Sequence, residues 1–258
     1  MKILFFGDVV GRPGRRILKK ALSEMRSQVD LVVVNGENAA HGYGITPKIV
    51  EEILDMGVDV ITTGGHFYDR KEWKDVLEQY PQVLVPGNYP GRLDRGYYVS
   101  SHNVAIINIH GQVFVNIILE HPFEVIDRIL DIVQRKYGQI PILVDFHGEA
   151  TSEKMAMGWY LAGRVSVVVG THTHVQTADE RILAGKTGYI TDVGMCGCVD
   201  TVIGMDKDAA IKRFTTGVPE RLEPPEKCDN LIAQGVLIEI DDDGKTTSMR
   251  RVVYNEKF

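Results

Sequence analysis

The sequence predicts an α/β fold in which a largely parallel β-sheet packs against a second sheet, with helices flanking both. Apolar strand-like runs alternate with helical segments through the first half of the chain, a pattern typical of parallel sheets. The middle and the C-terminal part are richer in strands, which favours a second sheet. The sequence has no internal repeat, low-complexity tract or linker, so residues 1–258 are expected to form one domain.

Helices are expected wherever apolar residues recur with helical spacing. The first begins beside Pro13, a residue type common in the first turn, and the segment 123–136 is amphipathic. The predicted helices span residues 12–25, 47–56, 72–79, 123–136, 152–161 and 204–217.

Strands are predicted at short apolar runs rich in β-branched residues. They span residues 2–6, 31–34, 58–62, 83–85, 140–145, 165–169 and 189–191. Alternating residues predict a hairpin within 97–115 that turns at Gly111. A second hairpin is expected from 234–241 and 245–254, with its turn at 242–244.

Composition and charge exclude several classes of function. The net charge of −6 and the pI near 5.8, without a basic run, argue against a surface that binds nucleic-acid backbones. The apolar start of the chain stops at Asp8, which is too short for a signal peptide or a membrane span. The spacing of Gly7, Gly11 and Gly14 does not fit a dinucleotide-binding loop.

The three cysteines are Cys196, Cys198 and Cys228. An odd number in a chain of this size does not suggest a disulfide framework, and a thiolate metal site lacks a fourth cysteine. We therefore expect free, partly buried thiols and a cytoplasmic protein.

Acid, amide and histidine side chains follow the predicted strands at their carboxyl ends. They are Asp8, Glu37, Asn38, His66, His147, His172 and His174. Ligands of α/β sheets gather beyond these ends, so the side chains are expected to converge. The two imidazoles of Gly170-Thr171-His172-Thr173-His174 follow a buried strand and lie on a turn, although alone they could be ordinary loop histidines.

Mixed carboxylate, amide and imidazole ligands favour two metal ions. Without His66, the set offers six such ligands, which are too many for one tetrahedral ion and suit two ions that share a carboxylate. The absence of cysteine from the set disfavours a soft-metal site. The predicted cofactors are two divalent or mixed-valence ions, iron or manganese in the first place and zinc or magnesium as alternatives. Ions about 3.5–4 Å apart would activate a bridging hydroxide and offset phosphoryl charge.

The sequence resembles the calcineurin-like metallophosphoesterases and, among them, the YmdB-like bacterial 2′,3′-cyclic-nucleotide 2′-phosphodiesterases. The matching segments are GDVVGRPGR, NGENAAHGYGIT, GGHFYD, DFHGEATSEKMAMGWYLAGRV, GTHTHVQTAD, and TDVGMCG followed by IGMD. They run from near residue 3 to about residue 215 and are highly specific together. The resemblance implies a calcineurin-like sandwich of two packed β-sheets flanked by helices, and an assembly of several identical subunits.

The resemblance also implies a role for each residue of the set. The first metal site would comprise Asp8, Glu37, Asn38 and His174, and the second Glu37, His147 and His172. Glu37 would bridge the two ions. The superfamily more commonly has an aspartate at the bridge and a histidine two residues after the first aspartate. Glu37 and Val10 stand at these positions, and both fit the YmdB-like branch.

The implied activity is hydrolysis of a 2′,3′-cyclic nucleotide to the 3′-nucleotide. A metal-bridging hydroxide would attack phosphorus, and His66 would protonate the departing 2′-oxygen. The expected partner is therefore a small phosphodiester substrate. A phosphomonoesterase of the same fold shares this chemistry and stays an alternative.

One motif departs from the family. The family pattern is Gly-Asn-His, whereas this chain has Gly64-Gly65-His66 and loses an amide ligand of the second ion. A catalytically weakened, nucleotide-binding regulatory protein is therefore a further alternative. Asn88, one strand further on, is a candidate replacement for the missing amide.

Four other polar residues have competing interpretations. Glu149 is best explained as an acid at a helix start, and alternatively as a carboxylate that orients a ligand imidazole. Asp192 either has that orienting role or simply ends its strand. Asp69 could hold His66 protonated. His110 shows no ligand spacing and is assigned to a surface or packing role.

Overall fold

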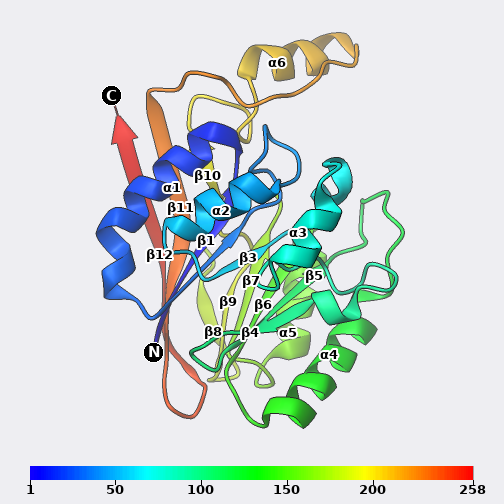
Figure 1. Cartoon of the computed structure of the whole chain (residues 1–258), viewed down its shortest axis with the longest axis vertical. Coiled ribbons are helices and arrows are strands. Elements are labelled where there is room, and N and C mark those ends of the chain that lie inside the picture. Colours follow the sequence, from blue (N-terminus) through cyan, green and yellow to red (C-terminus); the bar gives the residue numbers. More distant parts are fainter. Residues whose placement is uncertain (258) are drawn as a thin grey trace.

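The computed structural model describes residues 1–257 and contains two six-stranded β-sheets packed against each other (Figure 1). The first sheet has the order β12-β11-β10-β1-β2-β3. Its strands are β1 (Lys2–Val9), β2 (Leu31–Asn35), β3 (Val60–Thr62), β10 (Met195–Cys198), β11 (Asn230–Ile240) and β12 (Thr246–Lys257). Strands β10, β1, β2 and β3 are parallel, and β11 and β12 pair antiparallel at one edge.

The second sheet has the order β4-β5-β6-β7-β9-β8. Its strands are β4 (Tyr97–Val99), β5 (Ala105–His110), β6 (Ile142–His147), β7 (Val167–Thr171), β8 (Arg181–Leu183) and β9 (Thr187–Ile190). The four inner strands are parallel, and both edge strands are antiparallel to their neighbours. In each sheet, the carboxyl ends of several parallel strands therefore lie at the same end of the sheet, where polar loops can meet.

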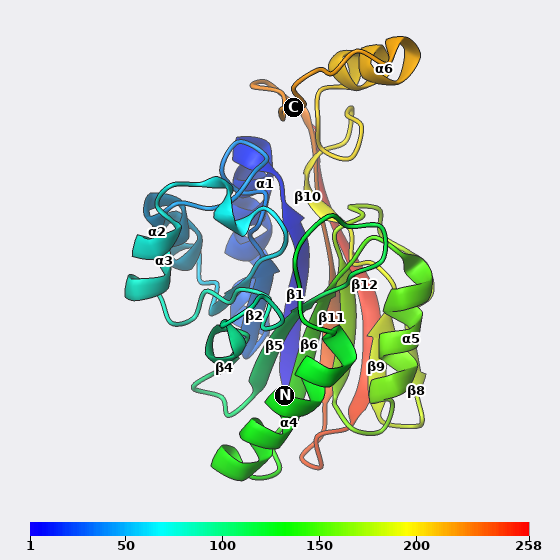
Figure 2. The same cartoon turned by 90° about the vertical axis from the view of Figure 1, so that its right-hand side faces the viewer.

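Helices cover the outer faces of the two sheets (Figure 2). Those on the first sheet are α1 (Gly11–Met25), α2 (Pro47–Asp55) and α3 (Trp73–Gln79), and those on the second are α4 (Pro122–Tyr137) and α5 (Thr151–Leu161). Helix α6 (Lys207–Thr216) lies apart from both groups, and the 3₁₀ turns are η1 (Arg26–Gln28), η2 (Phe67–Asp69) and η3 (Leu93–Arg95). No helix within residues 1–257 has the length and apolar run needed to cross a bilayer.

Strand β1 shows why the central strands are apolar on both faces. Ile3 and Phe5 point to the core between the sheets, whereas Leu4 and Phe6 point to the core beneath the helices. A strand covered on both sides has a nearly continuous apolar run, because alternate side chains enter two different cores. The predicted sandwich of two packed sheets flanked by helices is confirmed.

Some predicted elements differ in extent. The expected strand at 83–85 is reduced to a bridge between Val83 and Ile61. The first hairpin turns at residues 100–104 instead of at Gly111, and Asn103 in this turn adopts a positive φ of 58°. Asparagine tolerates this conformation better than most residues. Strands β8 and β10 were not predicted; β10 (sequence MCGC) lacks the β-branched residues typical of strands.

The prediction of three free thiols is wrong. Cys198 and Cys228 form a disulfide, and only Cys196 remains a free, buried thiol. The bond joins the last residue of β10 to a residue just before β11 and so closes the segment 199–227, which contains α6. Sequence spacing did not reveal the pair, because 30 positions separate two residues that neighbouring strands bring together. The cysteine argument for a reducing cytoplasm is thereby removed.

This pairing predicts the thiol content. Titration of the unreduced, denatured protein should find one thiol per chain, that of Cys196, and full reduction should expose three. Cys228→Ser should lower the free energy of unfolding by about 3 kcal/mol under oxidising conditions, because the unfolded chain is no longer cross-linked. Wild-type protein in reductant, the matched control, should unfold like the variant. Three thiols without reductant would contradict the assignment.

Candidate metal centre

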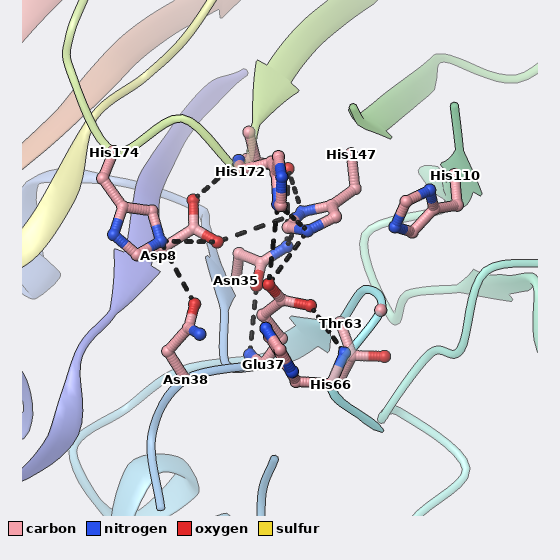
Figure 3. A network of polar contacts seen from close by, with 12 residues as sticks. Asp8, Asn35, Glu37, Asn38, Thr63, His66, His110, His147, His172 and His174 are labelled. Atoms are coloured by element: carbon pink, nitrogen blue, oxygen red, sulfur yellow. Dashed lines mark hydrogen bonds and ion pairs between the residues drawn. The ribbon is translucent and has the colours of Figure 1, made fainter. Parts of the chain in front are cut away.

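The predicted site residues converge at the carboxyl ends of strands from both sheets (Figure 3). The first sheet supplies Asp8 within β1, Glu37 and Asn38 after β2, and His66 after β3. The second sheet supplies His147 at the end of β6, and His172 and His174 after β7. All of them except His66 and His172 are buried.

Three lone-pair atoms meet at the first cluster, formed by Asp8, Asn38 and His174. His174 Nε2 lies 3.2 Å from Asn38 Oδ1 and 3.7 Å from Asp8 Oδ1. The other ring nitrogen, Nδ1, donates to the carbonyl of Ile203 at 2.8 Å, and burial lowers the pKa of His174. The neutral ring therefore presents an unprotonated Nε2. Asn38 Nδ2 donates to the carbonyl of Gly42, which directs Oδ1 toward the histidine.

Asp8 lacks the partner that a buried carboxylate requires. Its Oδ2 accepts the amide N–H of His172 at 3.1 Å, whereas Oδ1 is buried and accepts no hydrogen bond within residues 1–257. Burial and the carboxylates of Glu37 and Asp192 raise the pKa of Asp8 well above its ordinary value. Three acceptors that face one another without a donor fit a cation, because only a positive charge offsets their repulsion.

The second cluster comprises Glu37, His147 and His172, whose ligand atoms all lie within 4.8 Å of one another. Glu37 Oε1 lies 3.0 Å from His147 Nε2, and His172 Nδ1 lies 3.1 Å from the same nitrogen. Burial lowers the pKa of His147 to about 3, so its ring is neutral. His147 Nδ1 donates to Thr171 Oγ1 at 2.8 Å, which leaves the lone pair of Nε2 facing Glu37. This cluster also fits a metal ion.

Glu149 orients His172. Its Oε2 lies 2.9 Å from His172 Nε2, which leaves His172 Nδ1 to face the second cluster. Helix α5 begins at Thr151 with Ala150 as its N-cap, so Glu149 lies before the helix, and the acid of the first turn is Glu153. The default interpretation of Glu149 as a helix-start acid is therefore wrong, and the alternative that it orients an imidazole is supported.

The turn that carries both histidines is strained and is held by side chains. His172 and His174 have positive φ values of 96° and 61°, which cost non-glycine residues about 1–3 kcal/mol each. Asp192 Oδ2 accepts the amide N–H and the hydroxyl of Thr173, at 3.1 and 2.6 Å. The same oxygen accepts from the buried Lys154 at 2.8 Å. Asp192 thus fixes the turn, and no sequence signal pointed to its partner Lys154.

A buried hydrogen-bond network beneath the clusters joins the two sheets. Asp145 of β6 accepts from Thr62 Oγ1 at 2.5 Å and from Asn35 Nδ2 at 3.1 Å, both on the first sheet. Its other oxygen accepts from Thr171 Oγ1 at 2.7 Å, and Thr171 in turn accepts from His147. Burial raises the pKa of Asp145 to about 7. This network was not predicted, although a lone acid in the apolar strand ILVDFH is a usable signal for it.

His66 lies at the rim of the site. Its Nδ1 is 2.8 Å from Asp69 Oδ2, and its amide N–H donates to Glu37 Oε2 at 3.2 Å. Gly64, two residues before His66, packs so closely that a Cβ there would collide with the carboxylate of Glu37 and the ring of His147. Only glycine fits this position, and the backbone therefore passes in contact with the second cluster before it reaches His66.

Asn88 does not replace the missing amide. Its Oδ1 accepts the amide N–H of His110 at 2.9 Å, and its Nδ2 donates to the carbonyls of His110 and Glu120. The side chain is fully engaged with the backbone and does not reach the clusters. It instead fixes the position of His110, whose ring lies next to His147.

Comparison with known proteins gives the same relationship over nearly the whole chain. A family described as YmdB-like protein matches residues 4–252. The 2′,3′-cyclic-nucleotide 2′-phosphodiesterase of Bacillus subtilis (strain 168) is 44% identical over 263 aligned residues, which cover 99% of this chain and 98% of that protein.

Solved structures agree. A hypothetical protein from Thermus thermophilus superposes with a TM-score of 0.90 at 35% identity, over 99% of this chain and 100% of that chain. A phosphatase from Mycoplasma pneumoniae superposes with a TM-score of 0.90 at 34% identity, over 100% of this chain and 94% of that chain. The resemblance expected from the motifs is therefore confirmed, and the chain belongs to the YmdB-like family of the metallophosphoesterase fold.

Proposed function

We propose that this protein is a metal-dependent phosphodiesterase that hydrolyses 2′,3′-cyclic nucleotides to 3′-nucleotides. The observation that carries the proposal is the pair of adjacent acceptor clusters, one of which contains the unpartnered, buried oxygen of Asp8. The substrate class is taken from the activity named for the B. subtilis relative, which is 44% identical.

The residues fit two metal ions. Asp8, Asn38 and His174 would hold the first, His147 and His172 the second, and Glu37 would bridge them. When bound, such a pair of ions supplies an activated water and positive charge beside the phosphoryl oxygens. Iron or manganese suits this mixed carboxylate and imidazole set best.

His66 is proposed to donate a proton to the departing 2′-oxygen. Its ring is partly exposed and lies next to the second cluster, as a proton donor to a leaving group requires. Asp69 Oδ2, 2.8 Å from Nδ1, accepts a hydrogen bond from that nitrogen and orients the ring. Asp69 is a positioning residue, since it acts through His66.

We further propose that residues 1–258 act as one domain, because both sheets contribute side chains to the same clusters. The assembly of several subunits and the cytoplasmic location stay predictions.

The substrate can be tested directly. Purified protein should contain two metal equivalents and convert 2′,3′-cyclic AMP to 3′-AMP; EDTA should abolish turnover and added Mn²⁺ restore it. Hydrolysis confined to simple phosphomonoesters would show a phosphomonoesterase instead. Tight nucleotide binding without turnover in excess Mn²⁺ would support the regulatory alternative.

His66→Ala should lower kcat by roughly 10²–10⁴-fold, because the leaving oxygen loses its proton donor. Metal content should not change, since the ring is not among the proposed ligands. His102→Ala is the matched control, because His102 is an exposed histidine on the turn between β4 and β5. Wild-type turnover by the His66 variant would remove His66 from the acid role.

Glu37→Gln should weaken metal retention at least about tenfold, because both ions lose the shared negative oxygen. Elemental analysis after gel filtration measures this, with the exposed Glu78→Gln as control. Wild-type metal content in the Glu37 variant would contradict the bridging role.

A further inference from the structure

His110, the last residue of β5, lies beside the second cluster although no ligand spacing pointed to it. Its side chain is buried, with 1% of the residue exposed. The centroid of its ring lies 5.1 Å from that of His147 and 6.3 Å from that of His172. Figure 3 shows the ring on the side of His147 away from Asp8.

The hydrogen bonds of His110 determine which nitrogen is free. Nδ1 lies 2.6 Å from the carbonyl oxygen of Gly111, which can only accept, so Nδ1 carries the proton. In the neutral ring, Nε2 then has a lone pair. No residue within 1–257 donates a hydrogen bond to this nitrogen. The side chain of Asn88 binds both the N–H and the carbonyl of His110, so the backbone from which the ring projects is fixed.

Gly65 leaves the space into which this nitrogen points. A Cβ at position 65 would lie 3.3 Å from His110 Nε2 and 2.9 Å from Ile117 Cδ1. Any side chain at position 65 would thus compete with the imidazole for the same volume. Gly65 therefore removes the amide ligand of the family pattern and leaves room for the imidazole of His110.

We propose that His110 binds the second metal ion through Nε2, together with Glu37, His147 and His172. The proposal rests on the dinuclear centre of the proposed function. The ligand atoms of the other three residues lie within 4.8 Å of one another, and His110 lies next to this set rather than in it. Coordination would therefore require the ring to move toward an ion held by the other three residues.

A packing role explains these observations less well. Nε2 is not among the buried side-chain atoms without a partner within residues 1–257, so it reaches the open space beside Gly65. An apolar side chain of similar size would fill the volume beside Ile117 but would present no lone pair to this space. A metal ion would give Nε2 a partner, and Nδ1 would keep the carbonyl of Gly111 as its acceptor.

Metal titration tests the proposal on the apoprotein. Calorimetry with Mn²⁺ should find two sites in the wild type, and His110→Ala should weaken the second at least about tenfold while the first keeps its affinity. His102→Ala, an exposed histidine on the turn before β5, should bind like the wild type. Two unchanged affinities in the His110 variant would overturn the proposal and leave the dinuclear centre standing. Fewer than two sites in the wild type would overturn the dinuclear centre and the proposal with it.

A spectroscopic measurement on the wild-type chain covers the case in which His110→Ala fails to fold. In protein labelled with ¹⁵N-histidine, Zn²⁺ should move the Nε2 resonance of His110 from the position of a free lone pair to that of a metal-bound nitrogen. The Nδ1 resonance should keep the position of a protonated nitrogen. His110→Gln assigns the signals, and an Nε2 resonance that stays in place at two equivalents of Zn²⁺ would overturn the proposal.

Discussion

Repulsion between lone pairs is the constraint on which this end of the molecule depends. Strands of two sheets bring Asp8, Asn38 and His174 together where water is largely excluded, and no donor separates their facing atoms. Such an arrangement is unfavourable for the protein alone, because unpaired buried acceptors raise the free energy of the folded state. It persists because the sandwich, with its large apolar cores, fixes the strand ends regardless of what they carry.

The surroundings of the site solve one problem repeatedly, which is to choose the nitrogen that each histidine turns inward. An acceptor behind each ring holds the proton on the outer nitrogen. That acceptor is the carbonyl of Ile203 for His174, the hydroxyl of Thr171 for His147 and the carbonyl of Gly111 for His110. Side chains and carbonyls that are not themselves metal ligands therefore decide whether the histidines present lone pairs or N–H groups to the site.

The sequence was sufficient to predict the fold class, most helices and the convergence of the site residues. Hydrophobic periodicity and polar residues at the ends of strands are local signals, which a sequence shows directly. It was insufficient where partners come from distant segments. The Cys198–Cys228 bond, the Lys154–Asp192 pair and the approach of His110 to Gly65 each join positions that only the folded sheets make adjacent. Glu149 was misjudged for a related reason, since its partner lies on another loop.

The hydrogen bonds to Asp145 have a consequence for how the family can vary. Thr62 and Asn35 on one sheet share this carboxyl group with Thr171 on the other, so polar contacts fix the separation of the sheets next to the site. Deeper between the sheets, the separation depends on the volumes of apolar side chains such as Phe5 and Leu143. Substitutions in that layer can change stability while the ligands keep their spacing, so the apolar interior is free to diverge among relatives that retain the same chemistry.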